Sequence, residues 1–416
     1  MIHLPRLSLA TVLTACAVIN VASIYLAQPL LPFIGDTLDA GTSAMSVVQG
    51  GLQLGFGVGL VLFGILADTR ERRQLLTVMA AGLCVSAAAA AVAPTYVAFL
   101  LASIGMGCLA AVLPVVIATA AAAGDRRALV GILSGAPFGV VVGRTLAGVL
   151  GQVDWRLAFA LSAVSAAAVI VLVRTSLPPQ PVAGERLPVR RALGQMAALT
   201  RLPRNLTITL SNSVIYIGWS GVWTTLAFLL KGPPFSFSAF GIGLVGLVGL
   251  GGAVSGQVGA HLDMRFGETT AARICLGVIL VSAIALAFSG EVLVPLLVAL
   301  FLYNAAVWVL QAVNIPAAAR RAGPERAARG TALAYLTNFI CTAIGAVIGA
   351  LVWNDLGWGG VGALAAAACA VSIGFDLWGR GIGDRRTPEP AHEIAMAGVE
   401  TEGTRTGATT TRRRWC

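Results

Sequence analysis

The chain has 416 residues, of which 57% are hydrophobic and only 11% are charged, and its formal net charge is +10. Soluble domains contain about 45–50% apolar and about 25% charged residues, so this composition excludes a set of soluble domains. The basic residues lie in short segments between apolar runs and near the C-terminus. This distribution is typical of a positive-inside membrane protein and excludes a nucleic-acid-binding face.

Apolar runs predict twelve transmembrane helices, since a helix needs about 20 apolar residues to cross the hydrocarbon core. Six of them form a predicted N-terminal half, residues 1–173, with spans at 8–32, 45–67, 74–93, 96–122, 128–151 and 155–173. Six more form a predicted C-terminal half, residues 205–379, with spans at 205–230, 238–262, 271–289, 292–318, 327–353 and 358–377.

Two polar segments complete the chain. Segment 174–204 is rich in proline and arginine and is predicted to be a cytoplasmic linker, with a short surface helix at about 189–200. Segment 380–416 is rich in Thr, Gly, Glu and Arg, and we expect a disordered cytoplasmic tail.

The positions of lysine and arginine support the same topology independently. With a cytoplasmic N-terminus, the cytoplasmic segments hold 25 of the 28 basic residues, and the outer segments hold only Arg156 and Lys231. A missed helix would invert every later loop and destroy this bias. The sequence therefore predicts twelve spans with both termini in the cytoplasm.

A short motif, G-x-x-x-D-x-R, occurs at residues 64–70 and again at 259–265, in each case at a predicted cytoplasmic boundary. The two copies lie 195 residues apart, which indicates two homologous six-helix halves related by an axis along the membrane normal. The candidate gating residues in and beside these loops are Gly64, Asp68, Arg72, Gly259, Asp263 and Arg265.

The doubled loop motif resembles the signature of the major facilitator superfamily. The first span, from Asn20 through residues 25–32 (YLAQPLLP), and residues 134–156 resemble its bacterial drug–proton-antiporter-like branch. The resemblance implies an all-α fold of twelve spans in a bacterial inner membrane. It further implies a protein that acts as a monomer and transports by alternating access. It also implies that the loop carboxylates latch the two halves together on the cytoplasmic side.

The sequence departs from that family pattern at two places. Thr69 and Glu71 stand where the superfamily loop usually has a basic residue and a glycine. Ser103 stands where many proton antiporters of the superfamily carry an arginine.

Arg144 is the only ionisable residue deep inside a predicted span. It lies roughly 12 Å from the outer end of its helix, at about 1.5 Å per residue. A charge at such depth costs several kcal/mol and indicates a functional residue. Its partner could be Asp36 or Asp39, backbone carbonyls, or an anionic substrate, and the alternative is that Arg144 reaches the outer headgroups.

None of the eighteen acidic residues lies clearly in mid-membrane. Proton-coupled exporters usually need a titratable group in the pathway, and Asp36 is the best candidate here. The family resemblance implies protons as a coupling ion, with Asp36 as the candidate coupling residue, and the lack of a mid-membrane carboxylate argues against it.

The seventh and tenth predicted helices, at 205–230 and 292–318, each carry a stripe of amide and aromatic residues on one face. Such a face suits a pocket for amphipathic solutes. The alternative is that these residues form interhelical amide bonds and interface tryptophans. The stripes, with Asn20 and Gln28 of helix 1, give the candidate cavity residues Asn212, Tyr216, Trp219, Trp223, Asn304, Trp308, Gln311 and Asn314.

The sequence therefore predicts a secondary active transporter for a small-molecule substrate. Proton-driven efflux of amphipathic or drug-like molecules is the first hypothesis, and transport or exchange of a small organic anion bound through Arg144 is the second. We expect no enzymatic activity, cofactor or metal, since the spans show no nucleotide-binding loop, metal-ligand spacing or catalytic constellation.

Overall fold

A computed structural model describes residues 8–179, 189–201, 203–252, 254–323 and 326–384. Within these ranges every regular element is a helix. The first half contains α1 (Leu9–Tyr25), η1 (Gln28–Leu30), α2 (Leu31–Thr37), α3 (Thr42–Thr69), α4 (Arg72–Ala91), α5 (Tyr96–Leu109), α6 (Leu113–Ala122), α7 (Arg126–Leu150) and α8 (Arg156–Ser176). The rest contains α9 (Val189–Thr200), α10 (Pro203–Lys231), α11 (Ala239–Val245), η2 (Gly246–Gly252), α12 (Ser255–Ala287), α13 (Leu293–Ala322) and α14 (Ala327–Asp384).

The described residues contain ten apolar helical segments long enough to cross a membrane. Two of these segments, Ala239–Ala287 and Ala327–Gly379, have 49 and 53 residues. A single crossing takes about 20 residues, so each of these two is long enough for two crossings. Gly267 and Gly357, with φ angles of 76° and 63°, break the helical backbone inside them. The count is then twelve, and the predicted all-α membrane fold is confirmed.

Gly267 and Gly357 fall at the predicted breaks between 262 and 271 and between 353 and 358. Glycine is the residue that adopts a positive φ at no steric cost, so the chain reverses at these points without a long loop. The predicted surface helix is also present, as α9. The predicted tail lies outside the described residues from 385 onward, as do linker residues 180–188, and α14 continues to Asp384.

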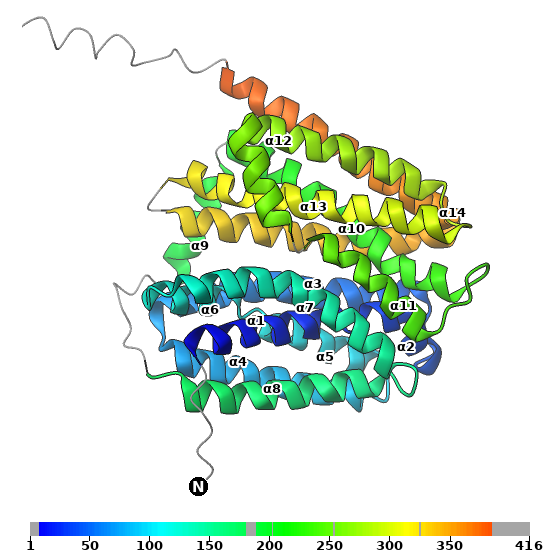
Figure 1. The fold of residues 1–416 in the computed structure, drawn as a ribbon, viewed down its shortest axis with the longest axis horizontal. Helices are drawn as coiled ribbons and strands as arrows, with labels where there is room; N and C mark the ends of the chain where they lie inside the picture. The colour runs from blue at the N-terminus through cyan, green and yellow to red at the C-terminus, as the bar shows by residue number, and fades with distance from the viewer. Residues whose placement is uncertain (1–7, 180–188, 202, 253, 324–325, 385–416) are drawn as a thin grey trace, which may run out of the picture.

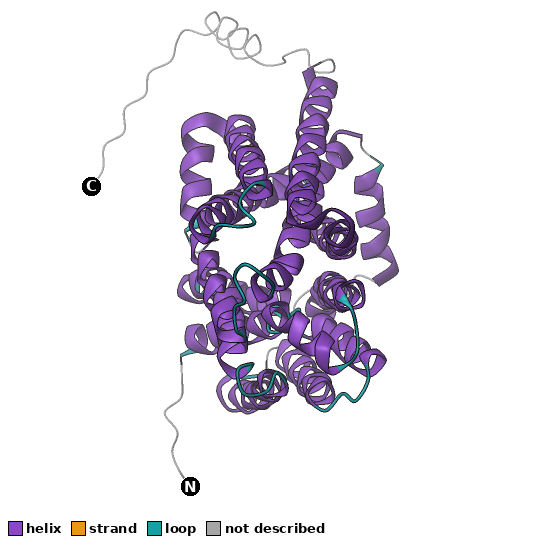
Figure 2. Cartoon of the chain, turned by 90° about the vertical axis from the view of Figure 1, so that its right-hand side faces the viewer, coloured by secondary structure: helices purple, strands orange, loops and turns teal. Residues whose placement is uncertain are grey.

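The helices form two layers with nearly parallel axes (Figure 1). Elements α1–α8 make one layer, and α10 with α12–α14 makes the other; viewed along the helices, the two layers lie one above the other (Figure 2). We call the end with α9 and the Asp68 loop the linker end, and the end with α2 and α11 the opposite end. They lie at the left and right of Figure 1.

The helix pairing inside the two layers follows the same scheme. In the first layer α1 packs on α7, α3 on α5, and α4 on α8. In the second layer α10 packs on α14, and α12 packs on α13 and on α14. Counted by spans, the pairs are 1–5, 2–4 and 3–6 in one layer and 7–11, 8–10 and 9–12 in the other. The shared scheme is the structural form of the repeat that the doubled loop motif indicated.

Small residues allow the closest helix contacts, as is common between helices in lipid. Gly139 of α7 lies so close to α1 that an added Cβ would be 2.7 Å from the carbonyl oxygen of Val18. Gly148 of α7 meets Gly243 of α11 in the same way, with a Cβ 2.6 Å from the Gly243 Cα. The first contact fixes α7 against α1, and the second joins the two layers at the opposite end.

Large apolar side chains are exposed on the outer faces of the bundle. Val85 on α4, Val164 on α8 and Val281 on α12 are each more than two-thirds exposed, at 69%, 67% and 68%. A soluble protein does not place apolar side chains over so much of its surface. These faces therefore fit contact with lipid hydrocarbon.

Candidate functional site

Arg144 lies inside the protein, at the contact between the two layers near the opposite end. Its side chain is 2% exposed, and its Nε donates a hydrogen bond to Oε1 of Gln28 in η1 at 2.9 Å. Its Cζ lies 3.5 Å from the centre of the Trp223 ring on α10 and 5.2 Å from that of Tyr25 on α1. One side chain of the first layer thus contacts α1, η1 and a helix of the second layer.

Neither of the two carboxylates considered as partners of Arg144, Asp36 and Asp39, forms an ion pair with it. Asp36 forms an ion pair with Lys231, and no ion pair of Arg144 is present among the described residues. Its Nη2 is buried without a hydrogen-bond partner. The backbone of η2 is near, since a Cβ added to Gly249 would lie 3.6 Å from Nη1. A buried guanidinium with a free donor is unfavourable alone and fits an anionic or acceptor-rich group.

Gln49 and Gln53 on α3 extend this polar cluster. Both side chains are fully buried, and neither amide oxygen nor amide nitrogen has a hydrogen-bond partner. Gln53 lies beside the hydroxyl of Tyr25. Gln28 also keeps its amide nitrogen free, and Asn20 donates to the carbonyl of Cys16 in its own helix at 2.8 Å.

Gln49, Gln53 and Tyr25 were not among the site residues predicted from the sequence. The available signal was two glutamines four residues apart in an otherwise apolar span, which places them on one helix face. That signal was present, but hydropathy alone does not reveal whether such a face points toward a neighbouring helix or toward a cavity.

The polar–aromatic stripes predicted on helices 7 and 10 face each other, on α10 and α13. Trp219 and Trp223 both donate their indole N–H to Oδ1 of Asn304, at 3.1 and 3.3 Å. Tyr216 donates its hydroxyl hydrogen to Oε1 of Gln311. The ring centres of successive aromatic residues on α10 lie 6.0 and 6.3 Å apart. These five residues therefore form one aromatic–amide wall beside Arg144.

Asn212 and Asn314 belong to a different group, farther toward the linker end. Asn314 donates to Oδ1 of Asn212 at 3.0 Å, and Asn212 donates to Oδ1 of Asn338 on α14 at 2.9 Å. Ser213 adds a further bond to Asn338 at 2.8 Å. This is the interhelical amide bonding considered as the alternative for the stripes. Trp308 is half-buried and lies against Gly252 of η2, apart from the other tryptophans.

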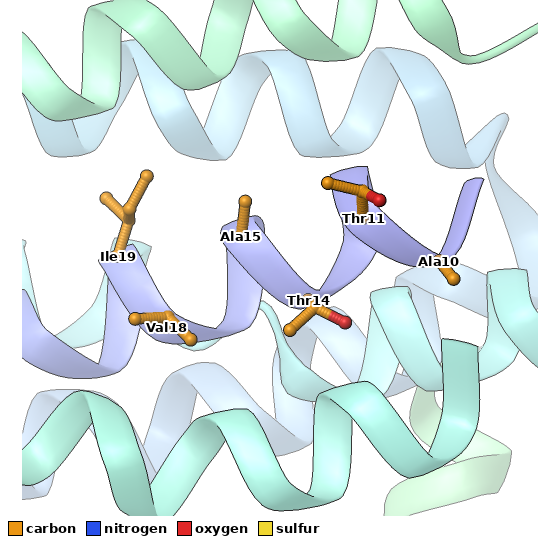
Figure 3. A pocket seen from close by; sticks show the side chains of 6 residues that line it. All are labelled: Ala10, Thr11, Thr14, Ala15, Val18 and Ile19. Carbon is orange, nitrogen blue, oxygen red and sulfur yellow. The ribbon is translucent and has the colours of Figure 1, made fainter. Parts of the chain in front are cut away.

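A wide-open cavity of about 540 Å³, lined by α1 alone, runs along this helix from its first turn at the linker end (Figure 3). Figure 3 shows that the lining side chains project from two sides of this helix. They are Ala10, Thr11, Thr14, Ala15, Val18 and Ile19. The last of them precedes Tyr25 by six residues, a rise of about 9 Å. The cavity therefore extends from the linker end to within about two helical turns of the Arg144 cluster.

The first loop motif joins the two layers at the linker end. Nη1 of Arg329 on α14 lies 3.4 Å from Oδ2 of Asp68 on α3. Gly64 packs against Pro114, and Arg72 donates from Nε to the carbonyl of Ala67 at 3.3 Å. Glu71, the departure from the family pattern, caps α4 by accepting hydrogen bonds from the backbone of residues 73 and 74.

In the described part of the chain, the ion pairs and close packing of the second loop motif are with its own layer. Asp263 on α12 lies 3.6 Å from Nη2 of Arg320 on α13, and Glu268 pairs with the same arginine at 3.1 Å. Gly259 packs against Ala312 of α13, and Arg265 lies over the ring of the adjacent Phe266. The repeated sequence thus forms a contact between layers in one copy and a contact within a layer in the other.

Asp36 lies at the opposite end, where its carboxylate pairs with Lys231 at the end of α10. Lys231 also donates to the carbonyl of Pro32 at 3.2 Å. This ion pair joins α2 of the first layer to α10 of the second. Among the described residues, an ion pair therefore joins the layers at each end, Asp68–Arg329 at the linker end and Asp36–Lys231 at the opposite end.

Two layers of paired apolar helices around a buried polar cluster are the architecture of a multi-pass membrane transporter. The sequence-family model of the Major Facilitator Superfamily matches residues 13–346. The chain belongs to this superfamily, and it is a membrane transporter rather than an enzyme.

The relatives and structural neighbours agree with this assignment. The uncharacterized transporter YgaY of Escherichia coli O157:H7 is 30% identical over 377 residues, covering 87% of this chain and 92% of that protein. The probable transporter SCO4007 of Streptomyces coelicolor is 30% identical over 391 residues, covering 88% and 85%.

Among solved structures, the nucleoside transporter NupG has a TM-score of 0.70 at 14% identity, covering 90% of this chain and 99% of that one. The human organic anion transporter MFSD10 has a TM-score of 0.68 at 17% identity, with the same coverage. At such low identity these likenesses establish the shared fold alone. Membership of the drug–proton-antiporter-like branch stays a prediction.

Proposed function

We propose that this protein is a secondary active transporter that moves a small organic anion by alternating access, with Arg144 binding the anionic group. The observation that supports this most is the buried guanidinium itself. In the described part of the chain, Arg144 has neutral neighbours only, Gln28, Tyr25 and Trp223, and its Nη2 has no partner. An anion bound there would supply both the missing charge and the missing acceptors.

The charge of the site also argues against a cationic substrate. The face of Trp223, the best position for a bound cation, is already occupied by the Arg144 guanidinium at 3.5 Å. A second cation about 4 Å away would be repelled by roughly 4 kcal/mol at an effective dielectric constant of about 20. An anion at the same place is attracted by a similar amount.

The ion pairs at the two ends fit the opening and closing that alternating access requires. In the proposed cycle Asp68–Arg329 separates when the linker end opens fully, and Asp36–Lys231 separates when the opposite end opens. The linker end is the cytoplasmic side in this proposal, since the predicted loops of that side carry most of the arginines. Both termini then lie in the cytoplasm of a bacterial cell.

Proton-driven efflux of amphipathic or drug-like molecules is the second candidate function. The observation that favours it is the aromatic surface of Tyr216, Trp219 and Trp223, which suits stacking of flat apolar solutes. Asp36 is then the proposed proton-coupling residue. Protonation of its carboxylate would break the ion pair with Lys231 and so link proton binding to opening at the opposite end.

Flux in proteoliposomes that contain the purified protein separates the two candidates. The anion proposal predicts that an internal pool of an organic acid accelerates uptake of a labelled acid, tested with benzoate, gluconate and succinate, without an imposed pH gradient. The second candidate predicts ethidium efflux only when a pH gradient is imposed. Gradient-dependent ethidium flux together with no acid exchange would overturn the anion proposal.

A further inference from the structure

Three buried glutamines near Arg144 keep amide atoms that have no hydrogen-bond partner. The unpaired atoms are Nε2 of Gln28 and both amide atoms of Gln49 and of Gln53. An unpaired buried amide is costly, so such groups usually pair inside the protein. In the neighbouring network Asn212 pairs both of its amide atoms, with Asn314 and Asn338, and Nδ2 of Asn338 is left unpaired.

The three glutamines lie on one side of the Arg144 cluster. Gln28 accepts the hydrogen bond from Arg144, and Tyr25 lies between Arg144 and Gln53. Gln49 lies one helical turn from Gln53, about 6 Å along α3 and on the same face. The free amide groups therefore continue from the guanidinium along α3 toward the opposite end.

Contacts on the other faces of α3 exclude lipid from these glutamines. Gly50 packs against the backbone of Ala343 on α14, where an added Cβ would lie 2.9 Å from its carbonyl oxygen. Gly51, the next residue, packs against Ile104 of α5. The face with Gln49 and Gln53, both 0% exposed, thus points to the interior between helices and away from lipid.

We infer that the site selects organic acids that carry hydroxyl or amide groups next to the acid group, and that Gln28, Gln49 and Gln53 bind those groups. The inference rests on the proposed function and adds its specificity. An amide side chain offers one acceptor and two donor hydrogens, which match a hydroxyl or another amide. A hydrocarbon chain in the same place leaves every one of these groups unpaired, and sites of this kind reject such analogues strongly.

The test is equilibrium binding to the purified full-length protein, measured by calorimetry with matched pairs of acids. The pairs are gluconate and hexanoate, mandelate and phenylacetate, and N-acetylglycine and pentanoate. In each pair the first acid adds hydroxyl or amide groups to a similar skeleton. The unchanged protein is expected to bind the first acid at least about 10-fold more tightly in one or more pairs, as one or two buried hydrogen bonds allow.

Replacing Gln53 by Met keeps the length of the side chain and removes the amide. The Gln53→Met and Gln49→Met variants are expected to lose about 5- to 100-fold in affinity for the preferred polar acid, with little change for its apolar partner. The control is Gln257→Met, at an exposed position on α12, which should change neither affinity. Elution of each variant as a single species on gel filtration shows that it is folded.

The outcomes separate this inference from the proposed function. If the polar and apolar acids of every pair bind equally, and both lose affinity in Arg144→Gln, the anion proposal stands and the glutamine inference is overturned. If the Met variants keep full selectivity, the inference is also overturned, because enclosed water then satisfies the glutamines. If no acid binds at all, the proposed function fails first and the inference fails with it.

Discussion

The ion pair between Asp68 and Arg329 gives the sharpest test of how the two layers separate at the linker end. The two charged atoms lie 3.4 Å apart, and the Coulomb energy at that distance is about 5 kcal/mol at an effective dielectric constant of about 20. The side chain of Asp68 is 47% exposed, so water screens most of this energy. Exposed pairs contribute about 0.2–1 kcal/mol, and we take about 1 kcal/mol as the upper value.

Asp68→Asn removes the charge but keeps the shape of the side chain. A loss of about 1 kcal/mol changes the ratio of closed to open linker ends by about fivefold. We expect correct membrane insertion, slower transport, and about fivefold faster alkylation of a cysteine placed at Thr14 in the cavity. The assay compares maleimide labelling of Thr14→Cys with and without Asp68→Asn, and the chain without the added cysteine is the blank.

The repeated motif supplies a matched control for this experiment. Asp263 occupies the corresponding place in the second copy, but its partner Arg320 lies in the same layer. Asp263→Asn should therefore leave the labelling of the cavity cysteine unchanged. Equal labelling effects of the two substitutions, or normal transport in Asp68→Asn, would show that the Asp68–Arg329 pair does not hold the linker end closed.

Three further predictions concern the opposite end and the amide network. Asp36→Asn and Lys231→Gln should each alter transport, and the double variant should be no worse than the single ones, because both remove the same ion pair; strictly additive losses in a double-mutant cycle would contradict this. Asn338→Leu leaves the partner amides of the network unpaired and should lower stability by about 1–3 kcal/mol, seen as a lower melting temperature, while substrate selectivity is kept. Gly148→Ala places a Cβ 2.6 Å from Gly243 and should force the layers apart at the opposite end; slower alkylation of the cavity cysteine checks this, and unchanged alkylation would count against it.

The fold was predictable because lipid imposes a simple length rule on each span. The apolar runs of about 20 residues matched the helical segments in chain order, including the tight breaks before α5 and at Gly357. The rule sums hydropathy along the chain and has no term for the direction of a side chain. It therefore gave the number of helices and their order but not which faces meet.

The candidate site was only partly predictable for the same reason. Arg144 stood out because a lone charge in an apolar run is costly wherever it points. The partners of Asp36 and Asp68 were not predictable, since Lys231 and Arg329 lie 195 and 261 residues away in the sequence. Gln49 was missed because a neutral amide barely lowers the hydropathy of its span, although burying it unpaired is costly.

The two copies of the loop motif show the limit of an argument from repetition. Their equal spacing of Gly, Asp and Arg predicted equal roles, but Asp68 bridges the layers and Asp263 does not. The difference arises outside the motif, because a different arginine lies opposite each carboxylate, Arg329 opposite Asp68 and Arg320 opposite Asp263. A repeat therefore predicts the shared helix pairing more reliably than it predicts the contacts of a single side chain.

Binding of the substrate's anionic group by Arg144 is tested by the affinity of one organic acid for four proteins. The proteins are the unchanged chain, Arg144→Lys, Arg144→Gln and the control Arg127→Gln, which changes an exposed arginine on the same helix. This binding role of Arg144 predicts that affinity falls about 30-fold or more in Arg144→Gln, falls less in Arg144→Lys, and does not change in the control. Equal affinity for the acid in Arg144→Gln and the unchanged protein would contradict it.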